Sequence, residues 1–462
     1  MFETSAYSFR SGRPARIFDK FAMIPLAAFV FVEIVTPLLH YSPRSSVRVS
    51  LEEKLQGIMA SRPENKIFWP VLAAITFVLV ARNWSRLTLP FHVKWLFAYL
   101  AFAGISVLWA FSPEFSFSRY VLQVMIVTSI VLPALLAHPA ADMIRSLFLC
   151  FAFACVLNIA FVINQEPIVI DNVILGYQGY FSFKGILGEC AAIAFLLSLH
   201  EMLYSGWRRV LGIVVIAIAI WLVIVSKSKG SFAIAVLAPF LAGLTLFIGK
   251  KLRLSPALVL LPPLIGYAVL SRMSGNLINR ISWHLYGNYS LSGRSDIWNF
   301  VNSEIAKSPL FGWGYQSFWL VGFNGPSIVD APGWIKGMPS GHNGYLDTQL
   351  EMGYIGLALL VAFIITTLHA VRRVADREPA RAWLLLTLAL YVILTNVLET
   401  TWMRGMEPLW LLFLIVAAEV GRHWQPFRPE PICRDPVIAG RRPGFTPPFS
   451  SGELARFQNR RR

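Results

Sequence analysis

The chain has 462 residues, of which 56% are hydrophobic and 14% charged, and its formal net charge is +16. A soluble chain normally carries about 25% charged residues, so this composition excludes an ordinary soluble protein and indicates a polytopic membrane protein. The net charge also suggests nucleic-acid binding, but the basic residues form short clusters between apolar runs, as expected of membrane orientation signals.

Twelve apolar runs along the chain are candidates for membrane-spanning helices. A hydrocarbon core of about 30 Å needs about 17–25 helical residues to cross it. We therefore predict one all-α, polytopic membrane domain over residues 21–421, with about 12 transmembrane helices and no internal repeat. The predicted helices cover residues 21–39, 67–81, 95–111, 120–138, 144–164, 185–203, 210–226, 231–249, 255–271, 346–371, 382–398 and 405–421.

The distribution of Lys and Arg predicts the orientation of the chain. Twelve helices put both termini on the same side of the membrane, and that side receives 26 of the 41 Lys and Arg residues. Because cytoplasmic loops carry the excess of these residues, we predict that both termini are cytoplasmic. The same count places the long loop 272–345, between the ninth and tenth helices, on the opposite, periplasmic side.

Polar segments flank the predicted membrane domain. Residues 1–20 are polar and basic, and the apolar run after them lacks a small-residue cleavage signal. This predicts a cytoplasmic N-terminal segment followed by a helix that is retained. Residues 422–462 are rich in Pro and Arg and cannot bury a core, which predicts a disordered, basic cytoplasmic tail. The arginines of this tail could also contact anionic lipid head groups.

The long loop contains a segment with helical periodicity. Ile297, Val301 and Ile305 recur at helical spacing, with Trp298 beside them, and Pro309 ends the pattern. This predicts an amphipathic helix that lies along the membrane surface.

Aromatic residues follow this helix closely. They suit an interfacial belt, and stacking on carbohydrate is the second interpretation. They are Trp313, Tyr315, Phe318 and Trp319.

The cysteines indicate neither disulfides nor a zinc site. Three of the four lie inside apolar runs, the fourth lies in the tail, and none has a second Cys or a His at metal-ligand spacing. They are Cys150, Cys155, Cys190 and Cys433. We expect neither a metal nor any other cofactor.

Several basic residues lie at the predicted outer ends of helices, where they oppose the positive-inside bias. Each one alone is explained as a side chain that extends to the membrane interface. Together they would form a ring of cations that an anionic group such as pyrophosphate would balance. The ring comprises Arg119, Lys184, Lys227, Lys229, Arg272 and Arg404.

The stretch MPSGHNGYLD, residues 338–347, places an imidazole and a carboxamide directly before a predicted helix. Histidine is suited to accepting a proton near neutral pH, so His342 is a candidate general base. Asn343 could hydrogen-bond a sugar or orient the imidazole. Asp347 and Glu351 lie one turn apart, and we expect them to pair with nearby cations.

Three motifs carry a resemblance to a known family. LSGRSDIW (291–298), SPLFGWGYQSFW (308–319) and HNGYLDTQLEMGYIGLALL (342–360) resemble, in order and spacing, the signature region of the O-antigen ligase and Wzy-type polymerase superfamily. The signature region covers residues 290–360, and the likeness is greatest to the exopolysaccharide polymerase branch. GYFSFKGILGE and SKSKGS resemble two upstream motifs of this family, and NVLETTW resembles its late-helix Asn/Glu motif.

The resemblance implies a metal-independent glycosyltransferase of the GT-C class in the bacterial inner membrane, with its active site facing the periplasm. Such an enzyme takes a glycan from undecaprenyl pyrophosphate and joins it to a hydroxyl of another lipid-linked unit, which makes exopolysaccharide or O-antigen. Transfer to lipid A core by an O-antigen ligase is the alternative. The implied partners are the lipid-linked oligosaccharide, membrane lipids, and the flippase and chain-length regulator of the same pathway, but no nucleic acid.

The resemblance also assigns roles by position. Arg294 matches the arginine that contacts the donor diphosphate, and His342 matches the base. Phe183-Lys184-Gly185 departs from the His-Lys-Asn or His-Pro-Asn of many relatives, and Lys229 stands where arginine is frequent, which puts the roles of these two lysines in doubt. The residues expected to bind pyrophosphate or sugar are Lys184, Lys227, Lys229, Arg119, Arg272, Asn343, Arg404 and Glu399.

Other classes of protein compete with this interpretation. A transporter or flippase of lipid-linked glycan would have many helices, but such proteins commonly contain repeated halves, and none is visible here. A non-catalytic scaffold of an envelope assembly would leave Arg294 and His342 without a role. A protein O-oligosaccharyltransferase is a further enzymatic alternative.

Overall fold

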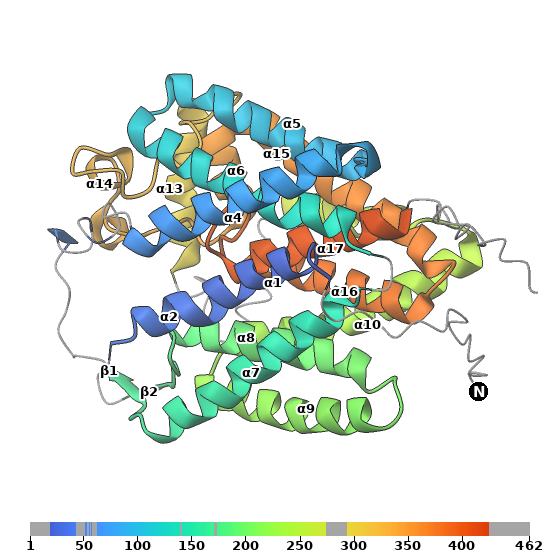
Figure 1. The fold of residues 1–462 in the computed structure, drawn as a ribbon. Helices are drawn as coiled ribbons and strands as arrows, with labels where there is room; N and C mark the ends of the chain where they lie inside the picture. The colour runs from blue at the N-terminus through green and yellow to red at the C-terminus, as the bar shows by residue number, and fades with distance from the viewer. Residues whose placement is uncertain are drawn as a thin grey trace, which may run out of the picture. The chain divides into compact units, whose positions relative to one another are not determined.

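The structure is a computed structural model that describes residues 19–42, 51–52, 55, 57, 62–138, 141–170, 173–273 and 293–424. This part of the chain is almost entirely helical (Figure 1), as predicted. Its only sheet is an antiparallel pair, β1 (Ile168–Ile170) and β2 (Val173–Gly176). The predicted N-terminal segment up to residue 18, loop residues 274–292 and the predicted tail beyond residue 424 lie outside the described residues.

The helices follow the apolar runs of the sequence. In chain order they are α1 (Met23–Val30), the π-helix η1 (Phe31–Val35), α2 (Thr36–Leu39), α4 (Pro63–Arg82), η2 (Trp84–Arg86), α5 (Phe91–Ser106), η3 (Val107–Trp109), α6 (Pro113–Leu136), α7 (Met143–Ile163), α8 (Lys184–Glu201), α9 (Trp207–Ser226), α10 (Lys229–Leu252), α11 (Pro256–Met273), α13 (Arg294–Lys307), α14 (Pro326–Val329), η4 (Gly333–Ile335), α15 (Gly344–Ala375), α16 (Pro379–Thr395) and α17 (Pro408–Trp424).

Seven helices in the described part are long and apolar enough to cross a membrane: α4, α5 with η3, α6, α7, α9, α10 and α15. Shorter apolar helices cover Met23–Leu39, Pro256–Gly266 and Pro379–Thr395. The chain is therefore a polytopic integral membrane protein. Each of the twelve predicted segments coincides with a helix or a continuous helical run, while the count of twelve crossings and the placement of the termini stay predictions.

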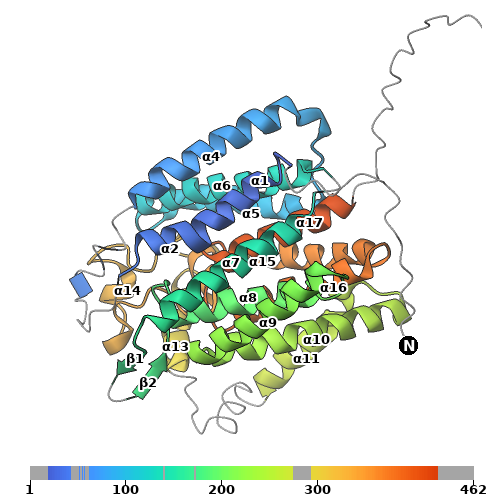
Figure 2. The same ribbon diagram turned by 60° about the horizontal axis from the view of Figure 1, so that its bottom comes forward.

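The last helices form the centre of the helical packing. Helix α15 packs against α5, α16 and α17, and α17 packs against α6 as well. Figures 1 and 2 show α4, α5 and α6 on one side of α17, and α8, α9 and α10 on the other. Both views also place α13, α14 and the β1–β2 pair at the same end of the helices.

A chain of aromatic contacts connects this centre to the segment between α16 and α17. Phe363 of α15 meets Phe413 of α17 edge to face, with ring centroids 5.4 Å apart. Phe413 in turn meets Trp402, with centroids 5.0 Å apart. Because edge-to-face pairs are directional as well as apolar, they fix the position of Trp402 and of the residues just before it.

Helix α15 is broken at Gly353, where the backbone has φ 63° and ψ −167°. The segment after α13 supplies backbone hydrogen bonds across the break. The amide of Tyr354 donates to the Pro309 carbonyl (2.8 Å), and the amide of Trp313 donates to the Leu350 carbonyl (3.0 Å). A Cβ atom at Gly353 would lie 2.1 Å from the Leu310 carbonyl oxygen, so only glycine permits this close approach.

The predicted loop helix is present as α13. Ile297, Val301 and Ile305 are buried as its periodicity predicted, and α13 packs against α15. The indole nitrogen of Trp298 donates to the Gly341 carbonyl (3.0 Å). The orientation of α13 along the membrane surface stays a prediction.

The prediction of an aromatic belt was wrong for three of the four aromatic residues. Tyr315, Phe318 and Trp319 are buried, and Phe318 and Trp319 pack with Phe300 of α13 in an internal cluster. Composition alone does not distinguish a belt from a buried cluster, because both use aromatic rings with a polar edge.

We expect Gly353→Ala to destabilise the fold by about 1–3 kcal/mol, because this backbone conformation is essentially restricted to glycine. Thermal unfolding of the purified full chain in detergent measures the effect. Gly230→Ala is the control, because no atom lies within 4 Å of a Cβ placed there. Equal melting temperatures for the two variants would contradict the role assigned to the break.

Candidate functional site

Arg294 and His342 meet on one carboxylate. The Nη2 of Arg294 donates to Oε1 of Glu399 at 2.7 Å, and the Nδ1 of His342 lies 2.9 Å from Oε2 of the same side chain. The Nε of Arg294 also donates to the Leu398 carbonyl (3.0 Å). The sequence singled out all three side chains, but it did not predict that Glu399 bridges the other two.

Three separate segments bring these side chains together. Arg294 is the first residue of α13, after Gly293, which has a φ of 86°. His342 lies in the turn before α15 and has a φ of 48°. Glu399 lies between α16 and α17. A non-glycine residue at positive φ is uncommon and costs free energy, so the packing around His342 must hold it there.

Asp347 holds the turn that carries His342. Its carboxylate accepts hydrogen bonds from the Gly341 amide (2.9 Å), the Thr400 hydroxyl (2.6 Å) and the Trp319 indole (2.9 Å). Asp347 was predicted to pair with a cation, but its hydrogen-bond partners among the described residues are neutral donors. A buried carboxylate with several donors is held strongly, so this network fixes the turn against the Glu399 segment.

The segment that carries Glu399 is itself held by Asn396. The side-chain oxygen of Asn396 accepts from the amides of Thr401 and Trp402, both at 3.0 Å. The amide of Gly344 donates to the carbonyls of Asn396 (2.8 Å) and Glu399 (3.0 Å). The NVLETTW motif is therefore a tight turn that packs against the start of α15.

Asn343 has a structural contact in the same place. Its side-chain oxygen accepts from the amides of Tyr345 and Leu346, both at 3.1 Å, which caps the N-terminus of α15. The backbone amide of Asn343 donates to the Thr400 hydroxyl (3.1 Å). The side-chain oxygen is thus engaged in the fold.

The three central side chains are partly accessible. The exposed fractions are 23% for Arg294, 38% for Glu399 and 31% for His342. A ligand can therefore reach them, while the reduced contact with water strengthens their mutual electrostatic interactions. A guanidinium with unused N–H groups next to an imidazole can bind an anionic oxygen and accept a proton.

Arg404 and Arg119 form a second polar group. The Nη2 of Arg404 donates to Oε1 of Glu351 (2.8 Å), which confirms the prediction that Glu351 pairs with a cation. Burial lowers the pKa of Arg404, but the carboxylates of Glu351 and Asp347 outweigh this effect and raise the pKa above its ordinary value. Arg119 donates to the Gln316 carbonyl, and the Gln316 amide donates to Glu351 (3.2 Å).

The predicted lysines gather at the β1–β2 pair. Lys184 donates to the Leu175 carbonyl (2.8 Å) and Lys227 to the Ile174 carbonyl (2.9 Å). Lys229 begins α10, two residues after Lys227, and is exposed. The β1–β2 pair lies at the same end of the helices as α13 (Figures 1 and 2).

The structure thus groups the predicted residues without joining all of them. Arg294, His342, Glu399 and Asn343 come together, Arg404 and Arg119 form a separate, partly buried group, and the lysines form a third. The helix α11 contains Arg272, but its side chain lies outside the described residues. Within the described ranges, no group of three or more His, Cys, Asp or Glu side chains is suited to a metal.

Comparison with known proteins shows a similarity that covers part of this site. Residues 214–361 match the O-Antigen ligase family model, and this range includes both Arg294 and His342. The resemblance to the O-antigen ligase superfamily is confirmed. The O-antigen ligase region ends before Glu399, so the bridging carboxylate lies outside the matched range.

The chain is also similar to proteins named for polysaccharide production or ligation. The exopolysaccharide production protein ExoQ of Rhizobium meliloti (strain 1021) is 25% identical over 330 residues, which are 67% of this chain and 72% of that protein. The "Putative polysaccharide ligase" of Rickettsia bellii (strain RML369-C) is 28% identical over 131 residues, 27% of this chain and 32% of that protein. The protein of the same name from Rickettsia felis (strain ATCC VR-1525 / URRWXCal2) is 25% identical over 131 residues, with the same shares.

We expect the Glu351–Arg404 pair to stabilise the fold. Glu351→Gln or Arg404→Gln alone leaves a buried charge without its partner, which costs about 3–5 kcal/mol. The double variant removes both charges and should be less destabilised than the sum of the single variants. Thermal unfolding in detergent of the unaltered protein, the two single variants and the double variant gives the double-mutant cycle. Additive losses would show that the two side chains do not interact.

Proposed function

We propose that this chain is a metal-independent glycosyltransferase of the GT-C class, which polymerises undecaprenyl-pyrophosphate-linked repeat units at the periplasmic face of the bacterial inner membrane. The coarser conclusion, an integral membrane protein of the O-antigen ligase or polysaccharide polymerase type, follows from the apolar helices and the family match. The steps below derive how the residues of the site would perform the reaction.

The observation that carries the proposal is the Glu399 carboxylate shared by Arg294 and His342. A carboxylate only accepts hydrogen bonds, so the Nδ1 of His342 must be the protonated nitrogen. This leaves the Nε2 of His342 with a lone pair that can take a proton from an acceptor hydroxyl. Glu399 would then stabilise the imidazolium that forms, as a positioning residue.

The reaction is a direct displacement at the anomeric carbon. The acceptor oxygen forms a bond to this carbon while the bond from the carbon to the pyrophosphate oxygen breaks. The pyrophosphate leaves with the electron pair, and the proton of the acceptor hydroxyl passes to Nε2 of His342. Attack opposite the leaving group inverts the anomeric centre.

Arg294 would stabilise the leaving pyrophosphate. Its Nε and Nη2 are used by Leu398 and Glu399, which leaves Nη1 to donate to a phosphate oxygen. Lys184 and Lys227 bond to β2, which lies at the same end of the helices as α13, and together with Lys229 they would supply further positive charge. The Arg404–Arg119 group supports the fold beneath the site, because its cations already have protein partners.

Polymerisation is favoured over transfer to lipid A core by the extent of the similarities. The exopolysaccharide production protein aligns over 67% of this chain, whereas the two proteins named as polysaccharide ligases align over 27%. O-antigen ligase activity is the alternative within the same chemistry. A transporter of lipid-linked glycan is the alternative from a different class.

We expect His342→Ala to lower glycan transfer by about 10²–10⁴-fold, because a positioned base contributes that much to proton transfer. Arg294→Ala should also abolish polymer formation. Each variant is expressed in a strain deleted for the gene, its membrane level is measured, and the surface glycan is resolved by size. His40→Ala is the matched control, because His40 also pairs with a glutamate, Glu64 (2.6 Å), and does not share the Glu399 carboxylate.

The products decide between the classes. Single repeat units that accumulate on the lipid carrier indicate a polymerase, and long glycan that stays on the carrier indicates a ligase. Normal glycan from both well-expressed variants would remove the catalytic assignment and favour the transporter.

We expect Glu399→Gln to lower kcat by at least tenfold with little change in KM for the acceptor. The amide can retain the shape of the side chain but loses the charge that stabilises a protonated imidazole. Glu399→Asp keeps the charge and should recover part of the rate. Kinetics on purified protein with a lipid-linked donor separate the two parameters, and a change confined to KM would assign Glu399 to substrate binding alone.

A further inference from the structure

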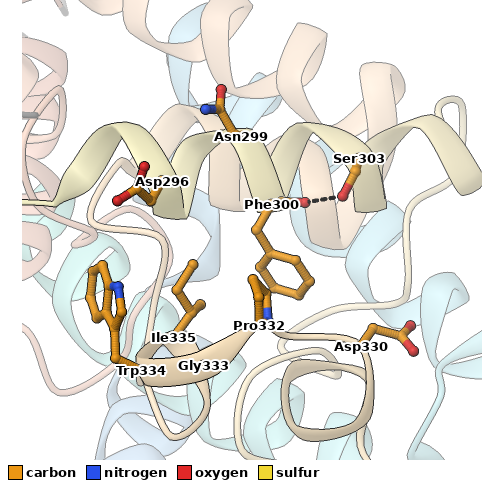
Figure 3. A pocket seen from close by; sticks show the side chains of 9 residues that line it. All are labelled: Asp296, Asn299, Phe300, Ser303, Asp330, Pro332, Gly333, Trp334 and Ile335. Atoms are coloured by element: carbon orange, nitrogen blue, oxygen red, sulfur yellow. Dashed lines mark hydrogen bonds between the residues drawn. The ribbon is translucent and has the colours of Figure 1, made fainter.

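A cavity of about 600 Å³ lies beside α13. Figure 3 shows it between α13 and the segment of residues 330–335, which contains η4. Small-molecule sites commonly occupy about 300–1,000 Å³. The cavity is therefore large enough for a ligand, and nothing in the site described above uses it.

Trp334, in the wall of the cavity, contacts the residue that precedes Arg294 and α13. The ring of Trp334 packs on Gly293, where a Cβ atom would lie 2.9 Å from the ring. Gly293 immediately precedes Arg294, which binds Glu399. A ligand beside Trp334 would thus lie next to the backbone that positions the Arg294–Glu399–His342 group.

The lining combines an apolar floor with polar groups at its edge. Phe300 and Ile335 are buried and project into the space between the two segments, whereas Trp334 is 51% exposed at one end (Figure 3). Asp296 lies near Trp334 at this end. A half-exposed indole beside a carboxylate presents one surface for stacking and one for accepting hydrogen bonds.

Two polar side chains of the lining are available to a ligand. The structure gives the side chains of Asp296 and Asn299 no partner among the described residues. Asp330 is used by Lys307 (2.9 Å), and hydrogen bonds from Lys307 to Glu304 and Asp330 raise the pKa of this lysine. Asp296 and Asn299 are therefore the groups that would define the polar specificity.

The charge of the lining selects the class of ligand. The lining contains two aspartates and no Lys, Arg or His, so it would repel a phosphate or an anionic lipid head group. A neutral ligand with hydroxyl donors on its rim and a C–H face fits both the carboxylates of the lining and the indole of Trp334. Sugar rings have this character.

We propose that this cavity is a subsite for a sugar unit of the glycan, adjacent to the unit that reacts, with Trp334 as the stacking surface and Asp296 and Asn299 as hydrogen-bond partners. The proposal rests on the proposed function for the presence of a glycan substrate. It deepens that function, because a second sugar contact would hold a growing chain between successive additions.

The test measures binding separately from transfer. The probe is the lipid-free repeat unit cut from the polysaccharide of the producing strain, and its binding to the full-length chain in detergent is followed by ligand-observed NMR. All proteins carry His342→Ala so that no turnover occurs. Adding Trp334→Ala or Asp296→Asn should weaken binding about three- to tenfold. Trp84→Ala, which removes another exposed indole outside the cavity, should leave binding unchanged.

Several results would overturn the proposal. The first is that the repeat unit does not bind detectably to the protein with an unaltered cavity. The second is that both cavity variants bind the repeat unit as tightly as the Trp84→Ala control. The third is that Trp334→Ala weakens the binding of inorganic pyrophosphate as much as it weakens the binding of the repeat unit. Melting temperatures show whether the variants fold, and Asp296→Asn keeps the test valid if Trp334→Ala does not. If His342→Ala retained transfer activity, the proposed catalytic role would be wrong. The binding measurements would still show whether the cavity binds the repeat unit.

Discussion

One carboxylate that serves two partners is the constraint on which the site depends. Glu399 accepts from Arg294 with one oxygen and contacts His342 with the other, and these partners lie 105 and 57 residues away in the chain. The charges of Arg294 and Glu399 offset each other, so His342 lies beside a paired charge and not beside an isolated one. Any movement of the Glu399 segment would change both contacts together.

The surroundings of Glu399 explain why it stays in place. Asn396 ties the segment into a turn, Asp347 joins it to the turn of His342, and Trp402 anchors it in the aromatic core. Because the Asn396 and Asp347 side chains each accept several hydrogen bonds, they specify one arrangement of this segment against the turn of His342. The site is thus assembled by hydrogen bonds that helices α13, α15, α16 and α17 bring together.

The sequence predicts the helices better than it predicts the site. Lipid requires long apolar runs with satisfied backbones, so composition alone locates the helices to within a few residues, and the periodicity of residues 294–307 locates α13. The bridging role of Glu399 has no local pattern, because it depends on how distant segments pack. The sequence predicted that Glu351 pairs with a cation, but not that the cation is Arg404, and it did not predict the burial of Phe318. The reason is the same, because the type of a residue does not show whether its side chain faces lipid, ligand or protein.

The break at Gly353 divides α15 into two parts that contact different surroundings. Residues 344–352, which begin beside His342, are tied by backbone hydrogen bonds to the segment after α13, while the helix beyond Gly353 is the long apolar part. A straight helix would transmit every tilt imposed by bilayer thickness to its end. Here the helix changes direction at a single glycine, and the segment after α13 bonds to the backbone on both sides of it, so the start of α15 beside His342 is held by that segment as well as by the helix.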